Sequence, residues 1–194
     1  KDEEAIATCR KAIDLDPKSF RAYHNLGNSL RKQKQHDEAF ASLNKAIELD
    51  PDDAEHFVIL TSILVAHGKL DEAVTASRRA LELDPKNVNV RVDRGTSLWA
   101  AGDFEKALAE HRKAQKQDPG HLHAITNAGV TLNTMGRPAE AIKEFEKALK
   151  LYPQDPGAHL NAGFTLNALG RPAEAIRAFE EYLRLAPNAQ NAGD

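Results

Sequence analysis

Prolines recur along this chain at one fixed interval, and that interval limits what the chain can fold into. Pro17 and Pro51 are 34 residues apart, and the same step leads to Pro85, Pro119, Pro153 and Pro187. A fixed period of about 20 to 50 residues is typical of repeat architectures, in which each unit buries its apolar face on the next. The prolines therefore predict an array of stacked units, for which a single compact core is not required.

The interval predicts five complete repeats after a leading half repeat. Residues 1–19 are expected to form the second helix of a partial repeat, because Ile6, Cys9 and Ile13 lie on an apolar stripe that Pro17 ends. Full repeats are expected at 20–53, 54–87, 88–121, 122–155 and 156–189, with a polar tail at 190–194. Together they predict a single array over 1–194.

Small residues return at fixed places in each repeat. The eighth place holds Gly27, Thr61, Gly95, Gly129 and Gly163. Because a glycine inside a helix costs about 1 kcal/mol relative to alanine, its return predicts that a second helix approaches closely there. The twentieth place, which indicates another close contact, is alanine throughout: Ala39, Ala73, Ala107, Ala141 and Ala175.

The limits of the helices are also marked. The fifteenth place, where a left-handed residue is expected to end the first helix, holds Lys34 and then Gly68, Gly102, Gly136 and Gly170. Lysine breaks the glycine pattern in the first repeat. Polar residues precede the next apolar stripes and are expected to cap those helices with their side-chain oxygens, at Ser19, Asp53, Asn87 and Asp155.

This pattern of small residue, glycine, alanine and proline resembles the tetratricopeptide repeat family over essentially the whole chain. The resemblance implies an all-α fold, a right-handed superhelical α-solenoid of antiparallel helix pairs. In that fold the first helix of every repeat lines a concave groove.

The groove implied by the resemblance is polar at one end and mixed along the rest. The residues expected to line it are Arg21, His24, Asn25, Asn28, Val58, Ile59, Val92, Trp99, Asn127, Val130, Asn133, Leu160, Asn161, Phe164 and Asn167. Apolar side chains interleaved with amides suit an extended peptide or a helix, because the amides can bond its backbone. For Val58, Val65 and Val130, packing between neighbouring helices is an equally good interpretation.

One peptide-binding pattern of the family is partly present. Asn25, Asn127 and Asn161 stand where the repeats of O-linked N-acetylglucosamine transferase carry a row of asparagines that grips a peptide backbone. Ile59 and Asp93 interrupt that row here.

A second pattern is largely missing. Chaperone-binding members clamp a C-terminal carboxylate with lysine and arginine, and His24 and Asn28 match this set only partly. Asn89 and Asp93 replace its cations. The resemblance therefore disfavours a receptor for chaperone tails.

Composition and charge exclude several classes of function. The formal net charge is −3 and no block of like charges occurs, so binding to nucleic acid is not expected. The apolar runs are too short for membrane insertion. The lone Cys9 excludes an intramolecular disulfide and is better interpreted as a small apolar residue than as a nucleophile.

No catalytic motif stands out, and neither a cofactor nor a metal is expected. The sequence has no phosphate loop, dinucleotide fingerprint or nucleophile elbow. Among 8 histidines, His121 and His123 form the tightest pair, but a solvated turn between repeats is the better interpretation. We therefore expect a chain without enzymatic activity of its own.

The third repeat departs from the pattern at places that are usually apolar, namely Arg91, Arg94, His111, Gln115 and Gln117. Such groups cannot be buried unpaired without a cost of several kcal/mol. They predict either a hydrogen-bonded network with Asp93 and Glu110 or a loosely packed, wet junction over 88–121, and the loose junction is favoured.

Two classes of function stay open. The first is a protein-interaction scaffold or adaptor that binds a peptide or a helix of a partner. The second is the substrate-targeting arm of a larger, glycosyltransferase-like enzyme whose catalytic domain lies outside this chain; the first residue, Lys1, is not an initiator methionine and suggests a piece of a longer protein. A weak homo-oligomer through the terminal helices is also expected. Ile6 and Cys9 have no preceding partner helix, and the polar tail after Pro187 is too short to cover Tyr182 and Leu183.

Overall fold

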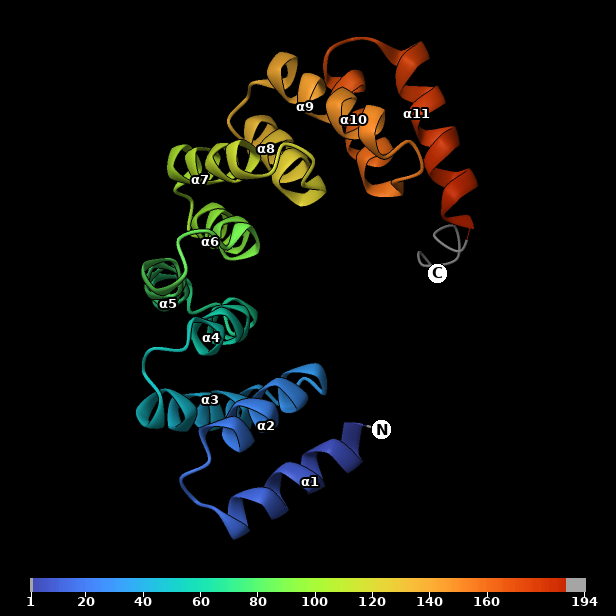
Figure 1. Ribbon diagram of the computed structural model, residues 1–194. Coiled ribbons are helices and arrows are strands. Elements are labelled where there is room, and N and C mark those ends of the chain that lie inside the picture. The colour runs from blue at the N-terminus through green and yellow to red at the C-terminus, as the bar shows by residue number, and fades with distance from the viewer. Residues whose placement is uncertain (1, 188–194) are drawn as a thin grey trace. The chain divides into compact units, whose positions relative to one another are not determined.

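The computed structural model describes residues 2–187, and all of their regular structure is helical. The helices in this range are α1 (Asp2–Leu15), α2 (Phe20–Lys32), α3 (His36–Leu49), α4 (Ala54–Ala66), α5 (Leu70–Leu83), α6 (Val88–Ala100), α7 (Phe104–Gln117), α8 (Leu122–Thr134), α9 (Pro138–Leu151), α10 (Pro156–Ala168) and α11 (Pro172–Leu185). No strand occurs between residues 2 and 187. The expected all-α fold class is therefore confirmed (Figure 1).

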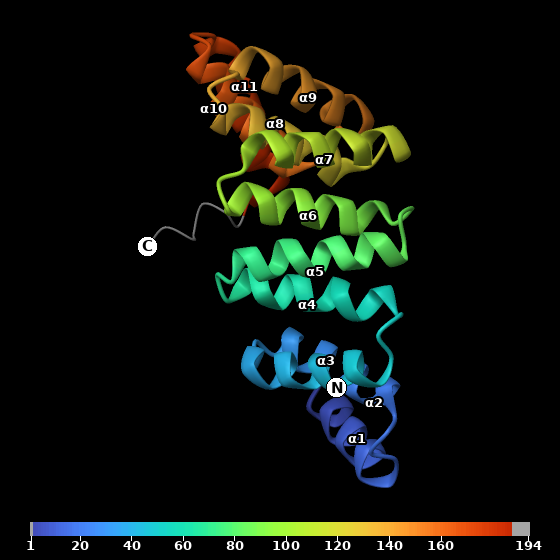
Figure 2. The same cartoon turned by 90° about the vertical axis from the view of Figure 1, so that its left-hand side faces the viewer.

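Helices of two lengths alternate along the chain. The even-numbered helices, which we call first helices, have 13 residues each, and the odd-numbered second helices have 14. Within a pair the connection is short, since α2 ends at Lys32 and α3 begins at His36. So short a connection makes the second helix run back along the first, which gives the expected antiparallel pairs. Figure 2 shows α4, α5 and α6 as neighbouring layers that contact one another.

Side chains cap the first helices as the sequence predicts. The accepting atoms and their distances to the backbone nitrogen are Ser19 Oγ (3.4 Å), Asp53 Oδ1 (2.9 Å), Asn87 Oδ1 (3.2 Å) and Asp155 Oδ1 (2.7 Å). The sequence does not single out His121 as a cap, yet its Nδ1 accepts from the Ala124 N–H at 3.2 Å. An unprotonated imidazole nitrogen is a hydrogen-bond acceptor, so histidine can fill this place.

The turn inside each pair is left-handed even where glycine is missing. The backbone angle φ is +69° at Gly68 and +71° at Gly136, and Lys34 adopts +59°. The first repeat therefore departs from the others in residue type but not in conformation. The Gln35 N–H donates to the Leu30 carbonyl at 2.9 Å, the bond that closes this kind of helix end. That bond holds Lys34 in a conformation that costs a residue with a Cβ atom about 1 to 2 kcal/mol.

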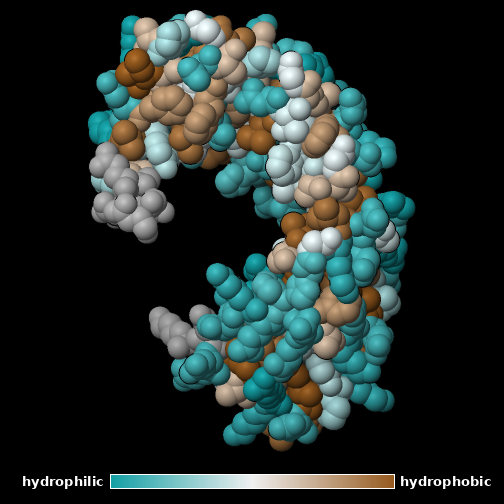
Figure 3. All heavy atoms as spheres, turned by 180° about the vertical axis from the view of Figure 1, so that it is seen from behind, coloured by the Kyte–Doolittle hydropathy of each residue, from teal (hydrophilic) through white to brown (hydrophobic). Residues whose placement is uncertain are grey.

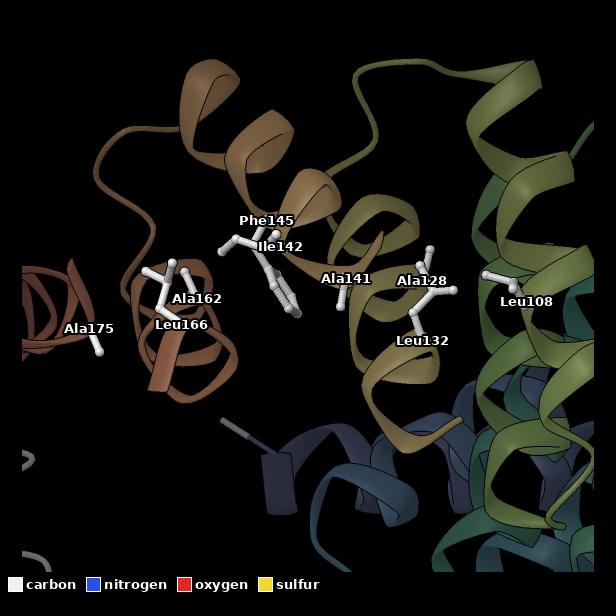
Figure 4. Packing of buried hydrophobic residues seen from close by; sticks show 9 residues of the cluster. All are labelled: Leu108, Ala128, Leu132, Ala141, Ile142, Phe145, Ala162, Leu166 and Ala175. Atoms are coloured by element: carbon white, nitrogen blue, oxygen red, sulfur yellow. The ribbon is translucent and has the colours of Figure 1, made fainter. Parts of the chain in front are cut away.

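Glycine in a first helix faces a large side chain in the second helix. A Cβ atom on Gly129 would lie 2.7 Å from the Phe145 ring, and one on Gly163 would lie 2.5 Å from the Phe179 ring. Phe145 is fully buried and belongs to a cluster formed mainly by α8, α9 and α10, with Leu108 of α7 and Ala175 of α11 (Figure 4). The close approach predicted for the eighth place is therefore confirmed.

The second repeat fills the same contact with two small hydroxyl-bearing residues. Thr61 stands at the glycine place, and the register of the repeats puts Ser77 where the fourth repeat has Phe145. Their exposed fractions are 2% and 0%. Each hydroxyl donates to a carbonyl of its own helix, Thr61 Oγ1 to Phe57 O at 2.7 Å and Ser77 Oγ to Val74 O at 2.9 Å. The larger residue on the first helix, Thr61 in place of glycine, is therefore matched by a smaller residue on the second helix, Ser77 in place of phenylalanine.

The chain divides into two compact units, Lys1–Ala101 and Gly102–Asp194. In the first unit α4 contacts both α2 and α6, and in the second unit α8 contacts α10, so first helices of neighbouring repeats lie together. The repeat limits, the single array and the superhelix expected from the sequence stay predictions. None of the helices within residues 2–187 combines the length and the apolar character that crossing a membrane requires.

The structure corrects the expectation that α1 presents an uncovered apolar edge. Ile6 is buried, and Cys9 and Ile13 are half-buried against a cluster that includes Leu26 and Leu30 of α2. The stripe of α1 is covered because it faces its own neighbour in the chain rather than solvent.

The loose junction favoured for the third repeat is wrong at Gln115. Its side-chain amide donates to the Ala124 carbonyl and to the Glu144 carboxylate, both at 3.2 Å, and accepts from Lys147 Nζ at 3.0 Å. The alternative of a hydrogen-bonded network therefore holds there, with partners other than the expected ones. His111 differs, because its Nδ1 is buried without a hydrogen-bond partner among residues 2–187.

Candidate peptide-binding surface

The predicted groove residues of α2 lie beside an acidic loop of the first unit. A hollow of about 640 Å³ there is lined by residues that include Arg21, His24, Asn25, Asp50, Asp53 and His56. His24 Nδ1 and His56 Nδ1 are 2.9 Å apart, and His56 is fully buried. Burial lowers the pKa of His56, while the nearby Asp53 carboxylate acts in the opposite direction. This end is polar, as expected, but its main feature is the histidine pair rather than the asparagine.

A second hollow of the first unit, of about 550 Å³, lies between α1 and α2 and includes Asn25, Asn28 and Cys9. Asn28 Oδ1 accepts from Arg31 Nη2 at 3.0 Å, so this amide is already bonded within α2. Burial raises the pKa of the Cys9 thiol. A raised pKa disfavours the thiolate that a nucleophile needs, which supports the packing interpretation of Cys9.

Two of the four apolar residues predicted for the groove of the first unit are core residues. Ile59 and Val92 are each only 5% exposed. Ile59 packs with Leu26 between α2 and α4, so the prediction is corrected at these two positions, because buried side chains do not face a ligand. Val58 is half-buried, and Trp99 alone of these four is substantially exposed, at 37%.

The predicted residues of the second unit lie on two helices that contact each other. Helix α8 carries Asn127, Val130 and Asn133, and helix α10 carries Leu160, Asn161, Phe164 and Asn167. Spacings of three and four residues place them along one face of each helix. Phe164 is 61% exposed and Asn167 is exposed, whereas the others are half-buried. We call this set the α8–α10 face.

Hydrogen bonds and a ring contact hold the α8–α10 face in place. Asn133 Nδ2 donates to Thr165 Oγ1 at 2.7 Å, and Thr165 Oγ1 donates to the Asn161 carbonyl at 2.7 Å, which links the two helices. The Phe164 ring lies edge-on to the Phe179 ring, with 5.2 Å between their centroids. Amides and an exposed aromatic ring are therefore brought together on an ordered surface.

Exposed apolar side chains are unevenly shared between the units. Large ones occur in the first unit at Leu15 and Trp99, and in the second at Leu151, Tyr152, Phe164, Ile176 and Leu183. In the view of Figure 3, the first unit is mainly teal, while brown and tan residues cover more of the second. The second unit therefore offers more apolar surface to a partner.

A hollow that the sequence analysis does not predict lies among α3, α4 and α5 of the first unit. It measures about 670 Å³, and its lining includes Phe40, Phe57, Leu60, Thr75 and Arg79. A prediction based on the first helix of each repeat does not find this hollow, because two of the three helices around it are second helices. A register comparison of second helices is the signal that would direct attention to it.

His56 is also missed by the sequence analysis. The third place of the other repeats holds small apolar residues, Ala22, Val90, Ala124 and Ala158. A histidine at a place that is otherwise alanine or valine is the signal that a register comparison could have found.

Four family models match parts of this chain. The model of the cytochrome c-type biogenesis protein H TPR domain matches residues 41–159. Three tetratricopeptide repeat models match residues 20–53, 132–192 and 1–33. No curated protein matches the chain in sequence.

Similar solved structures share the fold. MamA protein has a TM-score of 0.74 at 18% identity, with 92% of this chain and 97% of that chain covered. YrrB, described as a TPR protein with an unusual peptide-binding site, has a TM-score of 0.70 at 23% identity, with 93% of each chain covered. The pilF protein of Pseudomonas aeruginosa has a TM-score of 0.76 at 23% identity, with 89% of this chain and 85% of that chain covered. The helix pairs and a family model that spans more than half of the sequence agree, and the protein belongs to the tetratricopeptide repeat family.

Proposed function

We propose that this protein is a non-enzymatic interaction scaffold that binds an extended peptide or a helix of a partner protein on the α8–α10 face. The observation that carries the proposal is Phe164, a phenylalanine that is 61% exposed in the middle of a row of amides. Leu160, Asn161 and Asn167 share its helix face, because they are three or four residues away from it.

The energetics of binding favour this face. Large aromatic side chains supply much of the free energy at protein interfaces. The edge-on contact with Phe179 already orders the Phe164 ring. Less side-chain entropy is then lost when a ligand covers the ring, so more of the gain in apolar burial is kept as affinity.

The chemistry of the amides fits a peptide backbone. A side-chain amide both donates and accepts hydrogen bonds, as the backbone of an extended ligand does. Asn127 of α8 and Asn161 of α10 stand at equivalent places of their repeats. On α10, Phe164 stands between Asn161 and Asn167 in the sequence. The likeness of the fold to YrrB supports the idea that this architecture can present a peptide site.

A selection of random peptides displayed on phage, against the immobilised full chain, provides a ligand for the test. We expect Phe164→Ser to weaken the selected peptide about tenfold or more, because an aromatic anchor is lost. Ile176→Ser is the matched control, because Ile176 is also exposed (57%) but lies on α11. The double variant Asn127→Ala with Asn161→Ala is expected to lose about 1 to 3 kcal/mol of binding free energy with unchanged helicity.

The competing location is the hollow among α3, α4 and α5. Thr75→Arg places a large side chain at an exposed position of that hollow and leaves the α8–α10 face unchanged. Full affinity in Phe164→Ser together with lost affinity in Thr75→Arg would move the peptide site to the hollow and refute the proposal.

A further inference from the structure

Metal-ligating side chains of the first unit converge where α2 meets the loop before α4. His24 Nδ1 lies 2.9 Å from His56 Nδ1, and Asp53 Oδ2 lies 3.7 Å from the same His56 nitrogen. Ligand atoms of Asp50, Asp53 and His56 all lie within 4.8 Å of one another. These residues come from adjacent repeats, so only the folded unit brings them together.

We propose that His24, His56 and Asp53, with Asp50, bind a divalent transition-metal cation of the Zn²⁺ type. Imidazole nitrogens combined with carboxylate oxygens are a common ligand set for such ions. Zn–N bonds of about 2.0 to 2.1 Å at tetrahedral angles place two nitrogens about 3.3 Å apart. The two histidine nitrogens therefore need to separate by only a few tenths of an ångström to share one ion.

The charges around these ligands suit a cation. Asp52, which lines the same hollow, is engaged by Arg79 at 3.2 Å. Asp50 and Asp53 line the hollow together with Arg21, which is its one lysine or arginine side chain among the lining residues.

A hydrogen bond between two neutral rings is the alternative explanation for the short distance. In that state the Nδ1–H of one ring donates to Nδ1 of the other. A metal would replace this shared proton, and both rings would then carry their protons on Nε2. His56 Nε2 is buried without a hydrogen-bond partner within the described residues, so we expect weaker binding than at zinc sites whose histidines donate to a second shell.

The repeats supply substitutions that remove ligands without disturbing the fold. His56→Ala introduces the residue found at the same place as Ala22, Ala124 and Ala158. Asp53→Asn keeps an oxygen to accept the Glu55 N–H, which the Asp53 carboxylate now accepts at 2.9 Å, and removes the negative charge. Loss of metal can therefore be separated from loss of structure.

The test titrates the metal-free full chain with Zn²⁺ by calorimetry and, separately, with Co²⁺ by visible absorption. We expect one ion per chain and the Co²⁺ spectrum of a four-coordinate site. His24→Ala and His56→Ala should abolish that spectrum, and Asp53→Asn should weaken Zn²⁺ binding about tenfold or more. Helicity measured by circular dichroism is expected to match the unaltered chain in all three.

Two controls distinguish this site from binding elsewhere. Asp155→Asn makes the same change at the equivalent cap of α10, where Ala158 replaces the histidine, and His123→Ala removes a histidine of the pair at residues 121 and 123. Both variants are expected to bind like the unaltered chain. Adventitious binding, with equal affinity in His24→Ala and His56→Ala, overturns the proposal, and so does loss of binding in His123→Ala.

Discussion

The two units build different surfaces on the same pattern of helix pairs. In the first unit, α2 and the loop before α4 gather imidazoles, carboxylates and a guanidinium around a hollow. In the second unit, α8 and α10 present amides and the exposed Phe164. The contact inside the pairs also differs between single repeats, with Thr61 and Ser77 in the second repeat and Gly129 and Phe145 in the fourth. The comparison teaches that the repeat constrains the combined bulk at a helix contact and leaves the solvent-facing places free to specialise.

Exchanging the contact pair between units has the largest expected effect. Phe145→Ser alone leaves a cavity and should lower the free energy of unfolding by about 3 to 5 kcal/mol. Gly129→Thr alone overpacks against the ring and should cost about 1 to 3 kcal/mol. The double variant recreates the Thr61 and Ser77 pair and should recover about 1 to 3 kcal/mol of the summed loss. Urea unfolding of the four proteins measures this, and strictly additive losses would show that the two places are not coupled.

The pH dependence of stability tests the buried histidine of the second unit. Burial lowers the pKa of His111 to about 4, against about 6.5 for a histidine in an unfolded chain. The unfolded state therefore binds the proton first, so stability is full above about pH 6.5 and declines as the pH falls toward 4. Leu43 is the equivalent residue of the first repeat, and His111→Leu should remove about 1 to 2 kcal/mol of the loss between pH 7 and pH 5.

Urea unfolding at the two pH values provides the measurement. Some pH dependence should survive in His111→Leu, because burial also lowers the pKa of His56 in the first unit. A decline as steep as in the unaltered chain would contradict the burial of His111 as its cause.

Exchanging the turn residue between units has a smaller expected effect. Lys34→Gly relieves a left-handed lysine and should stabilise the chain by about 1 kcal/mol. Gly136→Lys places the residue of the first unit in the turn of the second and should destabilise by about 1 to 2 kcal/mol. Thermal and urea unfolding should show opposite signs for the two variants. Equal signs would mean that contacts of the side chain, rather than the backbone, decide the residue at this place.

Weak self-association is the smallest expected effect and should depend on α11 rather than α1. Ile176 and Leu183 of α11 are 57% and 38% exposed. The double variant Tyr182→Lys with Leu183→Glu should suppress concentration-dependent sedimentation, whereas Leu15→Glu on α1 should leave it unchanged. A concentration range of about 100-fold is enough to reveal a weak dimer by mass action. If the unaltered chain sediments as a monomer across this range, α11 forms no such contact.

The features that could be predicted from the sequence are local or periodic. The caps at Asp53 and Asp155 need only a polar residue before an apolar stripe. The contact at Gly129 follows from a glycine that returns once per repeat. Lys34 shows the limit of such reasoning, because its positive φ is imposed by the surrounding turn and not by its own preference.

The site was less predictable because a place in the repeat does not fix exposure. Ile59 and Val92 occupy places of first helices that face either a ligand or the adjacent first helix, and both are buried. The pairing of His24 with His56 needs residues from two repeats at different places of each, so no single-repeat pattern contains it. Phe164 is the opposite case, since an aromatic residue on the expected face remains exposed.

The most direct test of the central claim is to map the bound peptide by NMR. The full chain, labelled with ¹⁵N, is titrated with the selected peptide, and changes in amide chemical shift are followed residue by residue. If the peptide binds on the α8–α10 face, the largest chemical-shift changes will fall within Leu122–Thr134 and Pro156–Ala168 and will include Phe164. Changes centred instead on Phe40, Phe57 and helix α5, with residues of α8 and α10 unaffected, would contradict it.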